Sequence, residues 1–169
     1  MIGIIAFILL LPFSAYAFEY REDGMAIDVP DGSNIYYYTA TGTNMTGEML
    51  DAAQEEAPLV LTGAYSEDGI LLYSLKITRE EAEPAQENGT GAAREKAAAV
   101  KETLAEEYAF SEDTEETAAG RQSVVLSGDS LKNPDYAVKL YVLEDGGKVY
   151  TATVIYRKSA GGQHLNAAI

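Results

Sequence analysis

Residues 136–156 read YAVKLYVLEDGGKVYTATVIY, two runs of aliphatic and aromatic residues separated by Glu144-Asp145-Gly146. Aspartate–glycine pairs supply the positive backbone angles that tight hairpin turns require. The pattern therefore predicts a hairpin that pairs Tyr136–Leu143 with Lys148–Tyr156. Because Tyr141-Val142-Leu143 is apolar on both faces of a strand, we expect this hairpin to lie inside a sheet that is covered on both sides.

The same turn tripeptide occurs at Glu22-Asp23-Gly24 and at Glu67-Asp68-Gly69, again between apolar runs. After the second copy, Ile70-Leu71-Leu72-Tyr73 is also apolar on both faces, which again indicates a strand covered twice. Two further hairpins follow, together with two single strands. The hairpins pair Phe18–Arg21 with Met25–Val29 and Leu59–Tyr65 with Ile70–Ile77, and the single strands are Ile35–Thr39 and Gln122–Leu126.

A helical pattern runs from about Gly91 to Tyr108, with an apolar stripe at steps of four and three. The stripe consists of Ala93, Ala97, Val100, Leu104 and Tyr108. A shorter helix is predicted at Gly47–Glu55, and a last turn or two at Gln163–Ala168. Hairpins combined with helices predict an α+β fold, in which helices pack on a mainly antiparallel sheet as an α/β/α sandwich.

Two acidic segments flank the main helix. Residues 79–91 are polar and broken by proline and glycine, so we expect a mobile, exposed loop there. Residues 111–116 follow the helix, and their negative charge opposes the helix dipole, so this segment is expected to swing into solvent. Neither segment is a domain boundary, because the strands on either side need each other. Residues 18–169 are therefore predicted to form a single domain.

Residues 1–17 carry no charged side chain, contain an apolar run and end in Ala15-Tyr16-Ala17. This is typical of a secretory leader with a small-residue cleavage site, and it predicts an extracytoplasmic protein, secreted or associated with the cell envelope. No basic residue precedes Arg21, so the amino terminus acts alone or the true start lies upstream. The alternative is an uncleaved anchor. After cleavage we expect no stable membrane insertion.

The formal net charge is −15 and the chain has no cysteine. Such a charge repels nucleic acid, so we expect no nucleic-acid partner. The lack of cysteine excludes disulfides, thiol nucleophiles and thiolate metal sites, and favours a bacterial origin for an exported chain. His164 is the only histidine. Its place after two glycines favours an ordinary terminal residue over a catalytic one.

No catalytic motif, cofactor site or metal site is predicted. The loop Gly128–Asp135 carries several oxygen-bearing side chains but lacks EF-hand spacing, which favours a plain turn. The most suggestive surface feature is Tyr36-Tyr37-Tyr38. In a strand at least one of these rings faces away from the core, and tyrosine is common at recognition surfaces. Cross-strand packing on a sheet is the alternative.

The opening of the mature chain, Tyr20 followed by Gly24-Met25-Ala26-Ile27-Asp28-Val29-Pro30-Asp31-Gly32, resembles the PsbP family, as does the closing hairpin. That family includes extrinsic proteins of photosystem II, a eukaryotic Ran-binding protein and small exported bacterial proteins. The resemblance implies a fold without enzymatic activity that usually binds another protein. It carries no functional residue over to this chain.

These observations favour a secreted, non-enzymatic interaction domain with a protein or cell-envelope partner. Two alternatives stay open. One is a small secreted hydrolase that uses a pair of carboxylates. The other is an accessory domain tethered to the membrane by an uncleaved leader. The sequence does not predict the identity of the partner or the oligomeric state.

Overall fold

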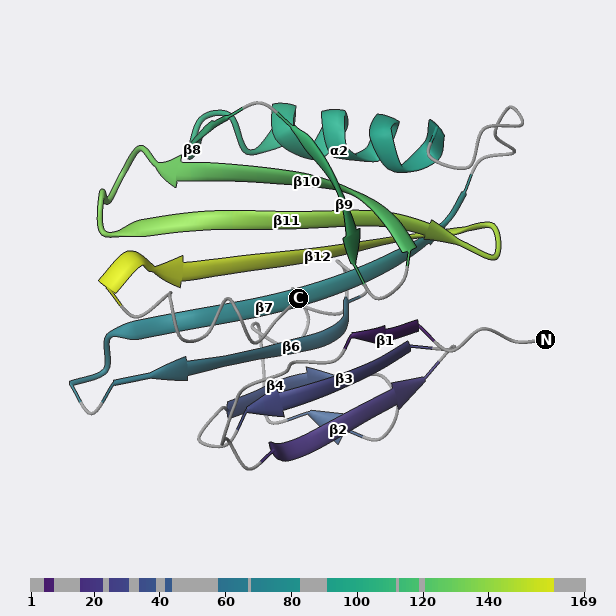
Figure 1. Ribbon diagram of the computed structural model, residues 1–169. Coiled ribbons are helices and arrows are strands. Elements are labelled where there is room, and N and C mark those ends of the chain that lie inside the picture. Colours follow the sequence, from purple (N-terminus) through teal and green to yellow (C-terminus); the bar gives the residue numbers. More distant parts are fainter. Residues whose placement is uncertain are drawn as a thin grey trace.

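In the part of the chain that it describes, the computed structural model contains a large sheet, a small sheet and the helix α2 (Figure 1). It describes residues 5–7, 16–22, 25–30, 34–38, 42–43, 58–66, 68–82, 91–111, 113–118 and 121–159. In spatial order the large sheet consists of β5 (Gly42–Thr43), β4 (Asn34–Tyr38), β6 (Pro58–Tyr65), β7 (Leu71–Glu81), β12 (Lys148–Arg157), β11 (Tyr136–Asp145), β10 (Arg121–Ser130) and β8 (Tyr108–Phe110), with β9 (Thr114–Ala118) also paired to β10. The small sheet consists of β1 (Ile5–Phe7), β3 (Met25–Pro30) and β2 (Tyr16–Glu22), and the helix is α2 (Gly91–Thr103).

The three predicted hairpins are confirmed as the pairs β2–β3, β6–β7 and β11–β12. All pairings in the large sheet are antiparallel, as expected for a sheet built from hairpins. In the last hairpin Asp145 pairs with Lys148, and the two glycines between them have φ angles of 60° and 77°. The positive angles therefore lie on Gly146 and Gly147 rather than on Asp145.

The Gly146-Gly147 turn can be tested directly, because nothing lies within 4 Å of a Cβ added at Gly147. We expect Gly147→Ala to lower the free energy of unfolding by about 1–2 kcal/mol, since alanine must then adopt a left-handed backbone. Urea denaturation measures the effect. Gly91→Ala is the control, because its Cβ is equally free and its backbone lacks the positive φ. Equal effects of the two substitutions would contradict a strained turn.

Two strands continue past their predicted ends because a neighbouring strand pairs with the extra residues. β7 continues through Arg79–Glu81, which the sequence placed in a mobile loop, because these residues pair with Lys148–Tyr150 of β12. The same prediction also included Gly91, which begins α2. β10 extends through Ser130, because Gly128–Ser130 pair with β8 on one side and partly with β11 on the other.

The main helix is shorter than predicted. It ends at Thr103, and Tyr108 belongs to strand β8, whose residues pair with the end of β10. The predicted solvent excursion of residues 111–116 is also wrong in part. Thr114–Ala118 form β9, which pairs with Arg121–Val125 of β10, although the side chains of residues 113–115 are exposed. An ion pair between Arg94 and Glu115 joins this edge strand to α2 and offsets the negative charge there.

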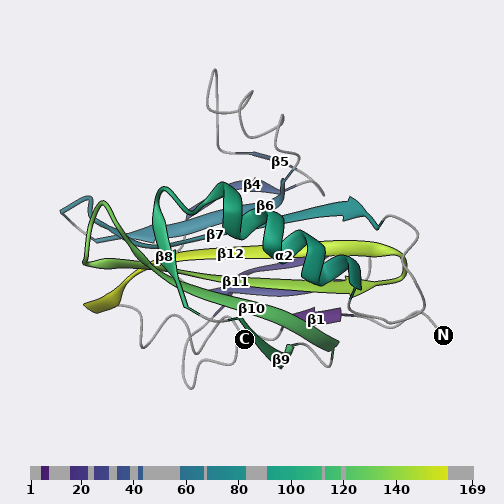
Figure 2. The same cartoon turned by 90° about the horizontal axis from the view of Figure 1, so that it is seen from above.

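Both faces of the central strands are buried. α2 covers one face of β10 and β11 (Figure 2). On this face Ala93 and Ala97 pack against Val124, Leu126, Leu140 and Val142. Tyr141-Val142-Leu143 is buried throughout, as predicted. Ile70 is an exception, because it is 39% exposed. It lies in the turn before β7, where its N–H donates to the Ser66 Oγ.

The expected fold class, a mainly antiparallel sheet with helical cover, is thus confirmed. The predicted helices at 47–55 and 163–168 lie outside the described residues, as does His164. Ile5–Phe7 of the predicted leader form β1, which is parallel to β3. Within the described part of the chain, no helix has the length and apolar character needed to cross a bilayer.

Candidate recognition groove between helix and sheet

The face of the sheet that carries α2 is apolar beneath the helix and polar beside it. Alternation along β7 buries Tyr73, Leu75 and Ile77 on the face away from the helix, and leaves the intervening side chains only partly buried. These are Ser74, Lys76 and Thr78, which lie on the helix side. Cross-strand partners share a face, so Thr151 and Thr153 of β12 lie beside Thr78 and Lys76. The apolar floor under the helix is thus continued by a polar floor next to it.

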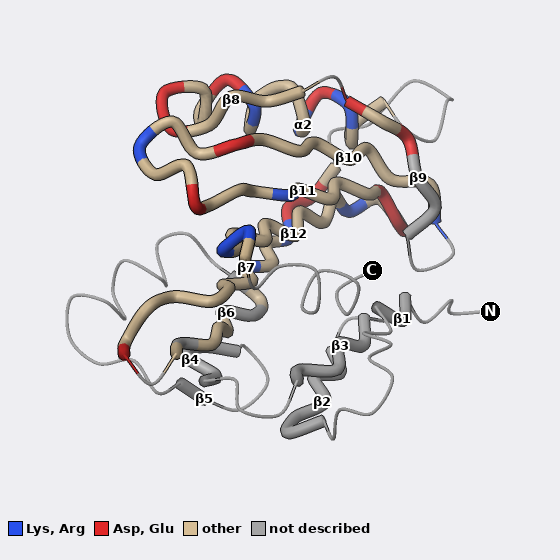
Figure 3. Tube along the Cα trace, turned by 60° about the vertical axis from the view of Figure 1, so that its left-hand side comes forward, with Lys and Arg blue, Asp and Glu red and all other residues tan. Residues whose placement is uncertain are grey.

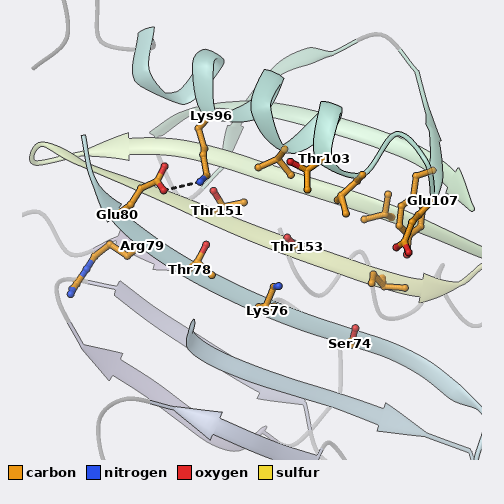
Figure 4. Close-up of a pocket in the computed structure, with 15 residues that line it drawn as sticks. Ser74, Lys76, Thr78, Arg79, Glu80, Lys96, Thr103, Glu107, Thr151 and Thr153 are labelled. Carbon is orange, nitrogen blue, oxygen red and sulfur yellow. Dashed lines mark hydrogen bonds and ion pairs between the residues drawn. The ribbon is translucent and has the colours of Figure 1, made fainter. Parts of the chain in front are cut away.

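A groove of about 700 Å³ lies between α2 and this polar floor (Figure 4). Its size falls within the usual range of ligand-binding pockets, roughly 300–1,000 Å³. Residues from α2, the turn that follows it and strands β7, β8, β11 and β12 line this groove. They are Ser74, Lys76, Thr78, Arg79, Glu80, Lys96, Val100, Thr103, Leu104, Glu107, Tyr108, Val138, Thr151, Thr153 and Ile155.

The groove arises because the face of α2 that packs on the sheet carries small side chains. Ala93 is 0% and Ala97 is 3% exposed, so the helix backbone lies close to β10 and β11. Helix contacts extend to β12, but β7 is not among its main neighbours. Small residues therefore tie the helix to one half of the sheet and leave β7 uncovered by it.

One end of the groove is polar. Lys96 reaches down from α2, and its Nζ lies 2.7 Å from the Oε2 of Glu80 on β7 (Figure 4). Thr78 and Thr151 lie beside this ion pair. Arg79 points away from the helix, consistent with its register position opposite Tyr150. This end therefore presents one lysine–glutamate pair and two hydroxyl groups.

The other end is largely apolar. Val100 and Leu104 of the helix side face Ile155 of β12, and Tyr108 closes this end. Burial raises the pKa of the Tyr108 phenol, and the negative charge of Glu107 adds to the shift, so the hydroxyl keeps its proton well into the alkaline range. Glu107 pairs with Lys132 at 2.7 Å, and this hydrogen bond raises the pKa of Lys132.

The groove does not assemble a pair of carboxylates. Its two acidic residues, Glu80 and Glu107, lie at opposite ends (Figure 4). Glu80 is paired with Lys96, and Glu107 with Lys132. A glycoside hydrolase instead requires two carboxyl groups about 5–10 Å apart on either side of one bond. Among the described residues, no group of three or more acidic or histidine side chains is placed to hold a metal ion.

The structure places the backbone of Tyr36-Tyr37-Tyr38 on β4, separated from β7 by β6. The side chains of these tyrosines lie outside the described part of the chain. The register shift between Ile35 and Tyr37 leaves Tyr36 without a partner position on β6. Tyr37 pairs with Leu61, Leu61 with Lys76, and Lys76 with Thr153, which makes one row across four strands.

No local pattern in the sequence predicts the groove. The available signal was the alternation in Leu71–Glu81, where Ser74, Lys76 and Thr78 interrupt a strand expected to be covered on both faces. The sequence pattern does not predict that α2 packs over β10 and β11. The other loop considered, Gly128–Asp135, holds an ion pair between Asp129 and Lys158 at 2.7 Å, followed by a turn in which Asn133 Oδ1 accepts from the Asp135 N–H.

The fold defined here is PsbP-like, which confirms the resemblance as one of fold. A similar solved structure is cyanobacterial PsbP (CyanoP) from Synechocystis sp. PCC 6803, with a TM-score of 0.55 and 12% identity over 89% of this chain and 86% of that chain. LpqN of Mycobacterium tuberculosis, described as involved in cell envelope biogenesis, has a TM-score of 0.48 and 14% identity over 84% of this chain and 76% of that one. No protein-family model matches the chain, and no curated protein has a matching sequence.

Proposed function

We propose that this chain is a non-enzymatic binding domain that acts outside the cytoplasm, and that the groove beside α2 is its recognition surface. The observation that carries the proposal is a groove of about 700 Å³ whose floor presents hydroxyl groups and a lysine, with an apolar end. A mixture of apolar surface and a few polar groups is typical of ligand-binding sites. The PsbP-like fold and the leader-like pattern of residues 1–17, which carry no charge, support a partner in the cell envelope or the extracellular space.

The tyrosines of β4 extend this proposal. Residues that pair across antiparallel strands share a face of the sheet, so the position of Tyr37 belongs to the same face as Lys76 and Thr153. The row through Tyr38 instead continues to Ile77, which is buried on the opposite face. We therefore propose that Tyr37 contributes to recognition and that Tyr38 contributes to the stability of the domain.

A groove-filling variant tests this function. Thr153 is half-buried in the groove floor, so Thr153→Trp is expected to occupy the space of the ligand. Partner recovered by affinity capture from envelope and extracellular fractions should fall on the order of tenfold or more, since a lost anchor at the centre of an interface has effects of this size. Thr114→Trp on the exposed edge strand β9 is the matched control.

Tyr37→Ala should reduce capture of the same partner while leaving the thermal midpoint close to that of the wild type. Tyr38→Ala should lower the thermal midpoint. Partner capture that survives Thr153→Trp but is lost with Thr114→Trp would contradict the groove as the recognition surface. A partner whose recovery follows neither variant would contradict it as well.

A further inference from the structure

We propose that the groove binds an extended acidic peptide in which an aliphatic side chain and a carboxylate lie two residues apart, the carboxylate above Lys76. This inference rests on the proposed function, because it names the chemistry of the partner at the same site. It follows from the length of the groove, the spacing of the groups on its floor, and its charge.

The groove is long and narrow. Its lining follows β7 from Ser74 to Glu80, six steps of about 3.3 Å, or roughly 20 Å. Along the helix side it runs from Lys96 to Thr103, about 10 Å at 1.5 Å per residue, and continues to Glu107 and Tyr108. A trough of this length matches an extended segment of about six residues better than a compact small molecule.

The groups on the floor have the period of a β-strand. Ser74, Lys76 and Thr78 occupy alternate positions of β7, so successive groups lie about 6.6 Å apart (Figure 4). An extended peptide that lies along β7 directs every second side chain toward this floor at nearly the same spacing. Each floor-facing side chain therefore meets one position of the groove, and the intervening side chains face outward.

The positions along the groove differ in chemistry. Ser74 lies at the end lined by Leu104, Tyr108 and Ile155, which suits an aliphatic side chain. The next position is Lys76, which suits a carboxylate. The third is Thr78, beside Thr151 and the ion pair of Lys96 with Glu80, which suits a polar group. The groove therefore favours an aliphatic and an acidic side chain with one residue between them.

Charge supports an acidic ligand at this place. The chain has a formal net charge of −15, and Asp and Glu recur on α2, on β9 and in the turns (Figure 3). The charged residues that line the groove are Lys76, Arg79, Lys96, Glu80 and Glu107, so the formal charge of its lining is +1. An incoming carboxylate is thus attracted locally, although the domain as a whole repels anions, and binding should be short-ranged and weaken with salt.

The test uses the full chain and a synthetic probe. The probe is an acetylated and amidated peptide, leucine-serine-glutamate-serine-leucine, whose spacing is the same in both chain directions. Isothermal titration calorimetry should give saturable binding with a dissociation constant below about 100 μM. The control peptide, leucine-glutamate-serine-serine-leucine, has the same composition, but its glutamate is shifted by one position. It should bind at least roughly tenfold more weakly, because the carboxylate then points away from the floor.

Protein variants complete the test. Lys76→Met should weaken binding of the probe roughly tenfold or more, and Lys76→Arg should restore most of it. Lys101→Met is the charge-matched control, since Lys101 lies on α2, is not among the residues that line the groove, and contacts Asp113 and the carbonyl of Ser111. Circular dichroism melts would establish that each variant is folded.

Equal binding of the two peptides, or equal loss from Lys76→Met and Lys101→Met, would overturn the inference. It would also be overturned if dodecanoate bound in a Lys76-dependent way and the peptide did not, since the ligand would then be an acyl carboxylate. The proposed function stands or falls separately. If the probe fails but Thr153→Trp still abolishes capture of the natural partner, the groove remains the recognition surface and only the acidic-peptide chemistry is wrong.

Discussion

Ala97→Glu is expected to lower the free energy of unfolding at pH 7 by about 3–5 kcal/mol, which is enough to unfold many domains. Ala97 is 3% exposed and packs with Ala93 against the apolar face of β10 and β11. A glutamate side chain there must displace the helix or bury a charge without a partner. Chemical denaturation followed by circular dichroism measures the loss.

The sign of the pH dependence gives a second readout for Ala97→Glu. Burial raises the pKa of a carboxyl group in the folded state above its unfolded value near 4.3. The folded state then tolerates the protonated form better than the charged one, so the deficit relative to the wild type should be smaller near pH 4 than at pH 7. Ala98→Glu is the control, because Ala98 is the next residue on the same helix and is exposed. Equal losses at the two positions would contradict the packing of α2 on the sheet.

Leu140→Ala should cost about 2–5 kcal/mol of unfolding free energy, because it removes a fully buried side chain from the middle of β11. Leu140 is 0% exposed and pairs with Leu126 on one side and Thr153 on the other, so it lies where the apolar floor meets the groove. The position is held by strands on both sides and by the helix above, so the cavity cannot collapse easily.

Leu131→Ala provides the matched comparison, since Leu131 is 59% exposed in the turn after β10. It should change stability by no more than about 0.5 kcal/mol. Urea denaturation of both variants measures the difference. A loss at Leu140 as small as that at Leu131 would mean that the core does not lie between α2 and β11.

The hairpins could be predicted from the sequence because their signals are local. An aspartate–glycine corner and the runs beside it determine which strands pair, and the two runs predicted to pair around Glu144-Asp145-Gly146 do so, for example Leu143 with Tyr150. The alanine-rich helix was also predictable at its start, but not at its end. Tyr108 continues the helical spacing of apolar residues, but its backbone lies in strand β8, where it pairs with Ser130 of β10. Such a competition between helix and sheet depends on a residue distant in sequence.

Residues 79–81 and 114–118 illustrate the same limit. Both stretches are acidic and polar, and composition favours a solvated loop. In the fold each lies beside a strand whose backbone groups need partners, and this pairing overrides composition. Sequence patterns report which side chains prefer water. They do not report which segments will form backbone hydrogen bonds with a neighbouring strand.

The groove could not be predicted from the sequence, because its formation depends on where α2 packs on the sheet. Ser74, Lys76 and Thr78 could be recognised as polar positions in an otherwise apolar strand, but their meaning depends on where α2 lies. Small alanine side chains bring the helix close to β10 and β11, and β7 then remains outside its cover. The sequence predicts a recognition role for the tyrosines of β4 only from the chemistry of their side chains. The register adds that Tyr37 shares a row with Lys76.

Site-specific photo-crosslinking in the producing cell tests the groove as recognition surface most directly. Benzoylphenylalanine placed at Thr103, an exposed residue at the rim of the groove, should yield a covalent adduct with one discrete partner on irradiation. The same group at Ala98, on the outer surface of the same helix, should yield none. A partner that crosslinks from Ala98 or from Glu115 on β9, and not from Thr103, would contradict recognition through the groove.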